Sequence, residues 1–289
     1  MPDLAAAPPP CAGDRALILI PARYASNRYP GKPLALLRGA GGAEKTLIER
    51  CCEAAEAARA EDAGVMGALV ATDDERIAAA VRGFGGRVVM TDPAAPNGTA
   101  RCADAMARLR AEGAPEAAAE IVVNLQGDAP LTPPWFVTAV INALRADPGL
   151  AAATPAVRCD GRALAQFRED RRAGRVGGTT VVTDLAGDAL YFSKEVIPFT
   201  EADFAPEAET PVLHHVGLYA YRPAALARYM AAETTRLETL EGLEQLRFLA
   251  IGERMRVVEV PARGRVFWEL NNPVDAPRIE AALAEMNQP

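Results

Sequence analysis

The sequence predicts an α/β fold built on a doubly wound, mostly parallel sheet, with a smaller region of antiparallel strands in the second half. Three observations support this prediction. Half of the 289 residues are hydrophobic, which suffices for one large domain. The first half alternates short apolar runs with helix-forming stretches. Residues 121–125 form a nearly continuous apolar run, which is typical of strands buried in parallel sheets.

The first half has regular strand–helix alternation. Pro21 is expected to end the first strand, because proline has no backbone N–H for the ladder. Thr99 is expected to be the N-cap of the third helix. The Gly-rich run 38–43 does not directly follow a strand, so a turn is expected there rather than a dinucleotide-binding loop. The expected strands are residues 16–20, 67–71, 87–90 and 121–125, and the expected helices are residues 46–59, 74–84, 99–111 and 135–145.

The second half has several strand candidates with few helices between them. This pattern predicts antiparallel additions around residues 178–222, in a subdomain that builds a pocket or a dimer contact. Residues 15–289 are expected to form one domain, after an Ala- and Pro-rich tail, residues 1–14, that is expected to be disordered. The expected strands are residues 150–157, 178–184, 189–193, 216–222 and 256–260, and the expected helices are residues 240–251 and 275–286.

The charge and cysteine content argue against several functions. The formal net charge of −7 argues against general nucleic-acid binding, although it permits a local cationic site for a nucleotide. No apolar run approaches the ~20 residues that a membrane span needs, and residues 1–13 lack the Lys or Arg of a signal peptide. The five cysteines form no CxxC pair, which favours reduced thiols in a cytoplasm over a disulfide framework or a zinc site.

A basic loop follows the first strand. Arg23, Arg28 and Lys32 fall within ten residues, separated by small residues such as Ser26 and Gly31. Cations and a small-residue loop at the carboxyl end of a first strand predict a clamp for a polyphosphate. The local chemistry also allows an ordinary basic surface loop.

A carboxylate follows the fourth strand. Asp128 comes after Gln126 and Gly127, at the expected carboxyl edge of the sheet. Mg²⁺ is usually held by one or two carboxylates together with phosphate oxygens, so Asp128 is a candidate metal ligand facing a triphosphate. The alternative is a turn aspartate that caps the next helix.

The basic loop also carries a family resemblance. Residues 20–33 read Ile-Pro-Ala-Arg-Tyr-Ala-Ser-Asn-Arg-Tyr-Pro-Gly-Lys-Pro, which closely resembles the nucleotide-binding signature of sugar-activating cytidylyltransferases. From about residue 16 to 286, the motifs follow the order found in the 3-deoxy-manno-octulosonate cytidylyltransferase family, so the chain resembles a member or a close paralogue. A Rossmann dehydrogenase is disfavoured, because the first strand does not lead into GxGxxG.

The resemblance implies a Rossmann-like nucleotidyltransferase fold and a reaction. CMP would pass from CTP to the anomeric hydroxyl of a 2-keto sugar acid, 3-deoxy-manno-octulosonate (Kdo) or an analogue, with release of pyrophosphate. It also implies Mg²⁺ as cofactor, a cytoplasmic homodimer and a place in lipopolysaccharide biosynthesis. No covalent enzyme intermediate is expected, because the motifs offer no nucleophile. The implied catalytic residues are Arg23, Lys32 and Asp128.

Further motifs imply the nucleotide-binding residues. The triplet Ala71-Thr72-Asp73 matches a family segment that helps to enclose the nucleoside, although Asp73 or Asp74 would also serve as an ordinary N-cap. The run Asn97-Gly98-Thr99-Ala100-Arg101 matches the family's Ser-Gly-Thr-Glu-Arg, and amides that open a helix suit an anion. The implied nucleotide-binding set is Ala22, Arg23, Ser26, Arg28, Lys32, Ala71, Thr72, Asp73, Gly98 and Gln126.

Three later motifs imply a pocket for the acceptor sugar. Residues 191–199 resemble Tyr-Phe-Ser-Arg-x-x-Ile-Pro-Trp, residues 214–222 resemble Arg-His-x-Gly-x-Tyr-x-Tyr-Arg, and residues 243–247 match Leu-Glu-Gln-Leu-Arg. Without the resemblance, the two adjacent histidines would suit a surface pair, and the last motif would suit an amphipathic helix surface. The implied substrate-binding set is Arg101, Gln126, Lys194, His215, Tyr219, Glu244 and Gln245.

The chain departs from the family pattern inside these motifs. Asn271 stands where the family segment Val-Asp-Thr-Pro-Glu-Asp has its second metal-binding aspartate, and an amide oxygen would hold Mg²⁺ more weakly. Asp275 would substitute only if the loop is rearranged. The departures leave open another acidic acceptor, such as an amino analogue of Kdo or a small phosphonate, or a paralogue that binds nucleotide with little turnover. The replacements are Ala100, Ala129, Lys194, His214 and Asn271.

Overall fold

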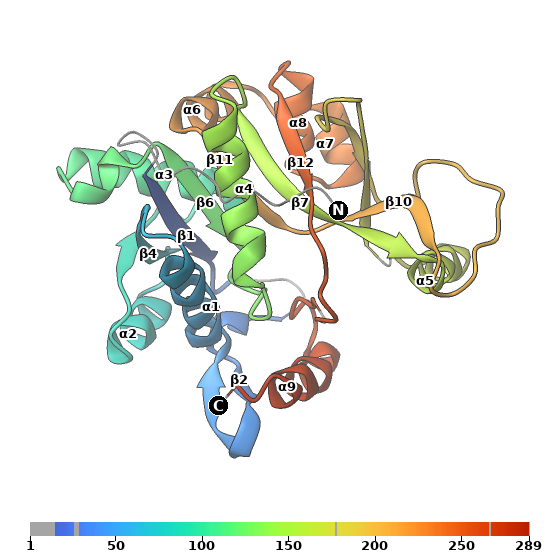
Figure 1. The fold of residues 1–289 in the computed structure, drawn as a ribbon. Coiled ribbons are helices and arrows are strands. Elements are labelled where there is room, and N and C mark those ends of the chain that lie inside the picture. The colour runs from blue at the N-terminus through green and yellow to red at the C-terminus, as the bar shows by residue number, and fades with distance from the viewer. Residues whose placement is uncertain (1–14, 26–28, 177, 266, 289) are drawn as a thin grey trace.

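The computed structural model describes residues 15–25, 29–176, 178–265 and 267–288. Its core is one large mixed sheet with helices packed on both faces, which confirms the predicted fold class (Figure 1). The proposed tail, residues 1–14, lies outside the described residues. None of the described helices is both long enough and apolar enough to cross a membrane.

The parallel half of the sheet has the order β5-β4-β1-β6. Its strands are β1 (Ala16–Ala22), β4 (Val65–Thr72), β5 (Val88–Met90) and β6 (Ile121–Leu125). The expectation that Pro21 ends β1 is wrong, because Pro21 still pairs with Ala71 of β4. The pairing of β1 with β6 ends at Leu19, so Pro21 has only one neighbouring strand in the ladder, where a proline is tolerated.

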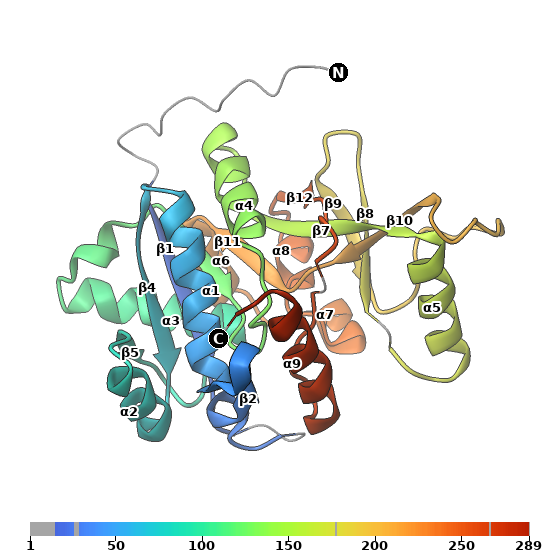
Figure 2. The ribbon, with the colours of Figure 1, turned by 60° about the horizontal axis from the view of Figure 1, so that its bottom comes forward.

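Alternate residues of β1 face two separate cores, because successive side chains of a strand point to opposite faces. Ile18 packs into a core with α1 (Leu47–Glu61), α4 (Pro134–Ala146) and α9 (Ala276–Glu285). Leu17 packs on the other face, against α3 (Gly98–Ala111). Figure 2 shows α1 and α3 on opposite sides of the sheet. The remaining helices are α2 (Glu75–Gly83), α5 (Gly161–Arg172), α6 (Pro223–Ala231), α7 (Arg236–Glu241) and α8 (Leu246–Ala250).

The start of α3 differs from the expectation. The N-cap is Asn97, whose side chain accepts a hydrogen bond from the backbone N–H of Ala100 at 2.8 Å. Thr99 is instead fully buried and lies 2.8 Å from the hydroxyl of Tyr221. The Gly-rich run 38–43 is a turn, as predicted, between β2 (Leu36–Arg38) and β3 (Glu44–Thr46).

Antiparallel strands extend the same sheet rather than forming a separate one. β11 (Leu218–Tyr221) runs antiparallel to β6 and to β7 (Ala152–Asp160), while β12 (Met255–Glu259) pairs in parallel with β7. Beyond β7 the order is β10-β8-β9, all antiparallel. These three are β10 (Glu209–His215), β8 (Thr179–Thr183) and β9 (Ala189–Ser193).

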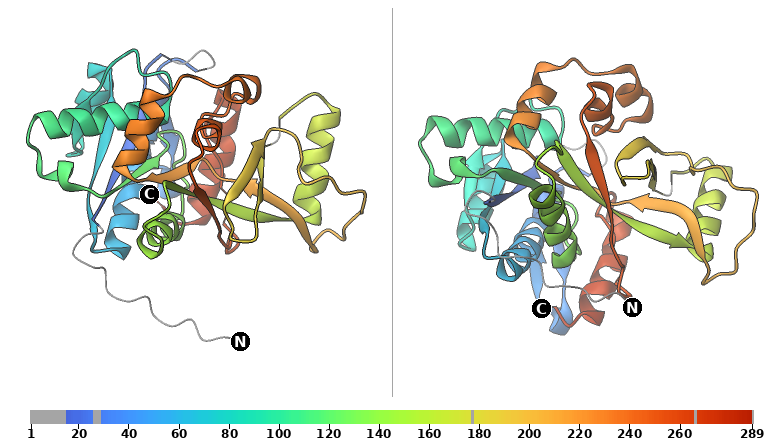
Figure 3. Two further views of the ribbon diagram at one scale, coloured as in Figure 1. Left: turned by 90° about the horizontal axis from the view of Figure 1, so that it is seen from above. Right: turned by 45° about the horizontal axis from the view of Figure 1, so that its top comes forward.

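The long strand β7 joins the two halves of the sheet. Its first residues pair with β11, and its later residues pair with β10 along the same edge. The chain passes from β10 to β11 through Val216 and Gly217, so the sheet changes partner at this point. Figure 3 shows β7 running from the parallel half into the antiparallel half.

Three elements of the second half were not predicted, and a fourth was predicted wrongly. β10, α5 and α6 were missed. The single helix expected over residues 240–251 is wrong: α7 ends at Gly242, whose φ of 62° is left-handed, and α8 begins only at Leu246. A glycine in this conformation ends a helix readily. The break leaves Glu244 and Gln245 in a connection rather than in a continuous helix.

Candidate active site

Two adjoining pockets lie at the carboxyl ends of β1 and β6. We call them the loop pocket, of about 380 Å³, and the sheet pocket, of about 890 Å³. Gln126 and Asp128 line both, so these two residues form the boundary between them. The loop pocket is lined by Pro21, Ala22, Arg23, Lys32, Pro33, Ala95, Pro96, Asn97, Gly98, Arg101, Gln126, Gly127 and Asp128.

A close backbone contact positions Asp128. A Cβ atom on Gly127 would lie only 2.5 Å from the carbonyl oxygen of Pro21, so a side chain does not fit there. The glycine therefore lets the end of β6 approach the end of β1. This approach places Asp128 opposite the loop that follows β1.

An ion pair joins two of the predicted residues. The Nζ atom of Lys32 lies 2.6 Å from Oδ2 of Asp128, and both side chains are partly buried. Arg23 lines the same loop pocket. Ser26 and Arg28 lie outside the described residues, so only two of the three cations in the proposed clamp are placed.

Arg101 is held by two neighbours. Its Nη1 atom lies 2.6 Å from Oγ1 of Thr91 and 3.3 Å from Oδ1 of Asp73, and its side chain is only 3% exposed. Asp74, rather than Asp73, is the N-cap of α2. Asp73 is thus left to pair with Arg101, which lines the loop pocket.

Only some of the remaining residues predicted to bind the nucleotide line the loop pocket. Among the described residues, Ala22, Gly98 and Gln126 line the loop pocket with Arg23 and Lys32. Ala71 and Thr72 end β4 and Asp73 follows it, and none of the three is part of the described lining of either pocket.

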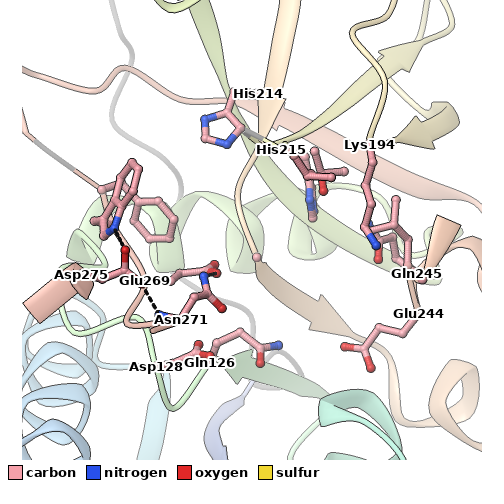
Figure 4. Close-up of a pocket in the computed structure, with 18 of the residues that line it drawn as sticks. Gln126, Asp128, Lys194, His214, His215, Glu244, Gln245, Glu269, Asn271 and Asp275 are labelled. Atoms are coloured by element: carbon pink, nitrogen blue, oxygen red, sulfur yellow. Dashed lines mark hydrogen bonds between the residues drawn. The ribbon is translucent and has the colours of Figure 1, made fainter. Parts of the chain in front are cut away.

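The sheet pocket gathers six of the seven residues predicted for the acceptor. They come from the end of β6, the β10–β11 junction, the end of β9 and the connection between α7 and α8 (Figure 4). Arg101 is the exception, because it lies in the loop pocket. The six residues are Gln126, Lys194, His215, Tyr219, Glu244 and Gln245.

Both histidines are neutral near pH 7. Burial lowers the pKa of His215 to about 3 and that of His214 to about 4. Thr154 gives its hydroxyl hydrogen to the carbonyl of Leu218 at 2.7 Å, so Nε2 of His215, 2.9 Å away, is the donor to that hydroxyl. The interpretation of a surface pair is wrong, since both side chains line the sheet pocket and His215 is 6% exposed.

The connection between α7 and α8 supplies two polar groups. Burial is the main cause that raises the pKa of Glu244 to about 7. Its carboxylate accepts a hydrogen bond from the backbone N–H of Thr99 at 3.4 Å, which ties this connection to the start of α3. Gln245 is 2% exposed, and its Nε2 atom has no hydrogen-bond partner within the described part of the chain. Buried donors are nearly always paired, so this amide is available to a ligand.

Glu241 is a positioning residue that the motifs did not indicate. Its carboxylate accepts hydrogen bonds from the backbone N–H of Lys194 at 3.0 Å and from the hydroxyl of Ser193 at 2.8 Å. It also accepts from the hydroxyl of Tyr191 at 3.2 Å. These bonds fix the end of β9 and thereby the lysine that faces the sheet pocket. No sequence signal separated Glu241 from an ordinary glutamate at a helix end.

The segment around Asn271 is anchored next to Asp128. The backbone N–H of Leu270 donates to the carbonyl of Asp128 at 2.8 Å. Asp275 shapes the loop: its carboxylate accepts from the backbone N–H groups of Asn271 at 3.0 Å and Asn272 at 2.6 Å, and from the indole of Trp268 at 3.2 Å. Both oxygens of Asp275 are therefore occupied, and this loop is not arranged for Asp275 to take over as a metal ligand.

The donor groups on this wall suit a hard cation. Asp128, Asn271 and Glu269 all line the sheet pocket and offer carboxylate or amide oxygens, the ligands that Mg²⁺ prefers. The described residues contain no group of three or more His, Cys, Asp or Glu side chains placed to hold a metal ion. A cation bound here would therefore depend partly on oxygens from a ligand or water. Sequence reasoning had not singled out Glu269.

Known proteins resemble this chain over most of its length. A family model described as cytidylyltransferase matches residues 17–255. The 3-deoxy-manno-octulosonate cytidylyltransferase of Maricaulis maris (strain MCS10) is 46% identical over 93% of this chain and 96% of the relative. The protein of that name from Anaeromyxobacter dehalogenans (strain 2CP-1 / ATCC BAA-258) is 43% identical over 92% and 97%.

A solved structure extends the likeness to three dimensions. It is described as CMP:2-keto-3-deoxy-manno-octonic acid synthetase complexed with CTP. It is 33% identical to this chain and has a TM-score of 0.76, covering 94% of this chain and 99% of its own.

Proposed function

The chain belongs to the cytidylyltransferase family, and we propose that it transfers CMP from CTP to the anomeric hydroxyl of Kdo or a closely related 2-keto sugar acid, releasing pyrophosphate. One observation carries this proposal: a cation-lined pocket and a larger polar pocket share Gln126 and Asp128. Two substrates that occupy the two pockets would meet at this boundary. A transfer between them needs that arrangement.

The loop pocket suits the triphosphate. Arg23 and Lys32 line it, and charged donors bind phosphate oxygens strongly. In the transfer, the anomeric oxygen forms a bond to the α-phosphorus, and the bond from that phosphorus to the bridging oxygen of pyrophosphate breaks. The proton of the hydroxyl leaves to solvent or base. Phosphoryl transfer of this kind depends mainly on positioning and charge stabilisation.

We propose Mg²⁺ as the cofactor, held by Asp128 with the oxygens of Asn271 and the triphosphate. When bound, Mg²⁺ neutralises charge on the phosphate oxygens. Lys32 pairs with Asp128 at 2.6 Å, so the lysine is already placed where the phosphates would come. Lys32 would then exchange its carboxylate partner for a phosphate.

The sheet pocket suits an acidic sugar. Lys194 and Arg175 are the cations that line this pocket, and both histidines are neutral at pH 7. Arg175 is paired with Asp170 at 2.8 Å, so we assign the sugar carboxylate to Lys194. Gln126, Tyr219 and the unpaired amide of Gln245 offer hydrogen bonds for hydroxyl groups.

Lys194 and Asn271 depart from the family pattern, and these departures favour a second candidate for the acceptor. A different acidic acceptor, such as an amino analogue of Kdo or a small phosphonate, would fit a pocket that has changed its cation and its metal-binding residue. A paralogue that binds CTP with little turnover is a further alternative. The test is pyrophosphate release from CTP and Mg²⁺ with each acceptor. Turnover with Kdo above the others supports the proposal, whereas CTP binding without turnover on any acceptor favours the paralogue. Comparable turnover with ATP or GTP would contradict the preference for CTP.

We also propose a cytoplasmic homodimer that acts in lipopolysaccharide biosynthesis. The four described cysteines are all unpaired, which suits a reducing compartment. The antiparallel region carries exposed apolar side chains, among them Leu185, Leu190 and Phe199, each more than half exposed. Such a surface favours a protein contact.

A further inference from the structure

We propose that Glu269 supplies the second carboxylate of the divalent-cation site, a role that the family pattern gives to an aspartate at the position of Asn271. The proposal rests on the proposed function, because the cation concerned is the one that accompanies CTP. In this chain the negative charge would come from two residues upstream, and Asn271 would add only an amide dipole.

The backbone places Glu269 beside Asp128. Leu270, which donates its N–H to the carbonyl of Asp128 at 2.8 Å, has a fully buried side chain. Its two neighbours, Glu269 and Asn271, both line the sheet pocket with Asp128. Figure 4 shows the three side chains on the same wall of the pocket.

The carboxylate of Glu269 is oriented by its surroundings. Its Oε2 atom accepts a hydrogen bond from Nδ2 of Asn271 at 3.3 Å. Its Oε1 atom occupies space left by Gly217, since a Cβ atom on that glycine would lie 2.9 Å from Oε1. Any larger residue at position 217 would press on this carboxylate. The structure thus leaves room for the carboxylate in the pocket.

The charges favour a cation at this place when substrates are bound. Asp128 and Glu269 would face an anionic triphosphate and an anionic acceptor in the same region. Like charges at close range destabilise one another unless a cation lies between them. Lys32 neutralises Asp128 in this structure, and we infer that the cation bound with CTP neutralises both carboxylates.

The loop has another anchor besides Glu269. Asp275 already holds the loop through two backbone N–H groups and one indole. The bond from Asn271 to Glu269 joins two pocket-lining side chains rather than the loop backbone.

The experiment measures metal binding without turnover. Mn²⁺ replaces Mg²⁺, CTP is present, the acceptor is omitted, and the enhancement of water-proton relaxation reports Mn²⁺ bound to the full-length enzyme. Glu269→Gln should weaken Mn²⁺ binding about tenfold, a change of the size found when groups around metal sites are altered. Glu269→Gln combined with Asn271→Asp should regain most of that loss. Glu285→Gln, which removes an exposed carboxylate from α9, is the matched control and should bind Mn²⁺ like the wild type.

Several outcomes decide the proposal. Equal Mn²⁺ affinity in wild type and Glu269→Gln overturns it. A raised KM for the acceptor with unchanged Mn²⁺ affinity also overturns it, and assigns Glu269 to a cationic group of the acceptor. The circular dichroism spectrum and the urea unfolding midpoint check that the variant is folded, and both should match those of the wild type. Failure of the proposed function is seen separately, as absence of pyrophosphate release by the wild type with every acceptor.

Discussion

The ammonium group of Lys32 lies 2.6 Å from the carboxylate of Asp128, and this ion pair joins residues that are 96 positions apart. The sequence had assigned one to the triphosphate and the other to the metal. Their contact means that each charge is compensated before substrates arrive. In the proposed function, CTP and its cation would exchange partners with this ion pair at a site that is already assembled.

The first prediction concerns this lysine. Lys32→Ala should weaken CTP binding by roughly 1.5–3 kcal/mol, the scale of a lost charged hydrogen bond. Calorimetric titration with CTP and Mg²⁺ measures it. Lys45→Ala is the control, because Lys45 is also ion-paired but lies outside both described pocket linings. Unchanged CTP affinity in Lys32→Ala would remove the lysine from the clamp.

The second prediction concerns the metal dependence of turnover. Asp128→Asn should abolish most activity, because it removes a full charge from the cation site. Asn271→Asp should lower the Mg²⁺ concentration needed for half-maximal activity, and should raise activity if the acceptor is Kdo. A Mg²⁺ titration of pyrophosphate release compares the variants with the wild type. Identical curves for wild type and Asn271→Asp would show that residue 271 does not face the metal.

The third prediction concerns stability against pH. Burial raises the pKa of Glu244 from 4.5 to about 7, so the folded state binds more protons than the unfolded state between these values. Glu244 therefore lowers the free energy of unfolding as pH rises from about 4.5 to 7. Glu244→Gln should remove this loss, and urea unfolding at pH 5 and pH 8 measures it. The expected gain appears at pH 8 relative to wild type. Glu285→Gln, which removes an exposed carboxylate, is the control. If the free energy of unfolding of Glu244→Gln falls with pH as steeply as that of the control, the prediction is contradicted.

The fourth prediction concerns the acceptor. Lys194→Ala should raise the KM for the acidic acceptor and leave the KM for CTP nearly unchanged, because Lys194 lines only the sheet pocket. Lys194→Arg, which restores the residue of the family pattern, should recover most of the acceptor affinity. Initial rates at varied acceptor and CTP concentrations separate the two constants. An equal rise in the KM for the acceptor and the KM for CTP would show that Lys194 does not contact the acceptor specifically.

The fifth prediction concerns assembly. Light scattering at micromolar concentration should give twice the chain mass of 30.6 kDa. Phe199→Ser should shift the population toward monomer, because Phe199 is 84% exposed in the antiparallel region. Val274→Ser is the control, because Val274 is 81% exposed but lies outside the antiparallel region. A monomeric wild type would argue against the homodimer.

Sequence patterns predicted the buried parallel strands well. Residues 121–125 were assigned correctly to the last residue, because a buried strand between turn signals has few alternatives. α5 was missed since half of its residues are charged, and Leu164 and Phe167 are its main apolar anchors. The helix expected over residues 240–251 was wrong because Gly242 adopts a left-handed conformation that ends α7. The sequence alone does not show that the chain changes direction at this glycine.

The site was predicted less completely than the fold. Motif positions brought Lys32, Asp128 and Gln245 to the two pockets. The burial of His215 was not predictable, because it depends on β7 and β10 packing together. Glu241 bonds to residues of β9 that are distant in sequence, and Glu269 reaches the pocket through the shape of its loop. No local sequence pattern marks either residue.

The boundary made by Gln126 and Asp128 has a consequence for redesign. Since the two pockets share only these described residues, acceptor-side positions of the sheet pocket can be changed while the residues that line the loop pocket stay as they are, provided that Glu269 and Asn271 beside Asp128 are also kept. An engineer who diversifies positions 194, 214 and 245 while keeping residues 126 and 128 would search acceptor chemistry alone. In this respect the two pockets are separable, because the lining of the loop pocket can be kept while the sheet pocket is varied.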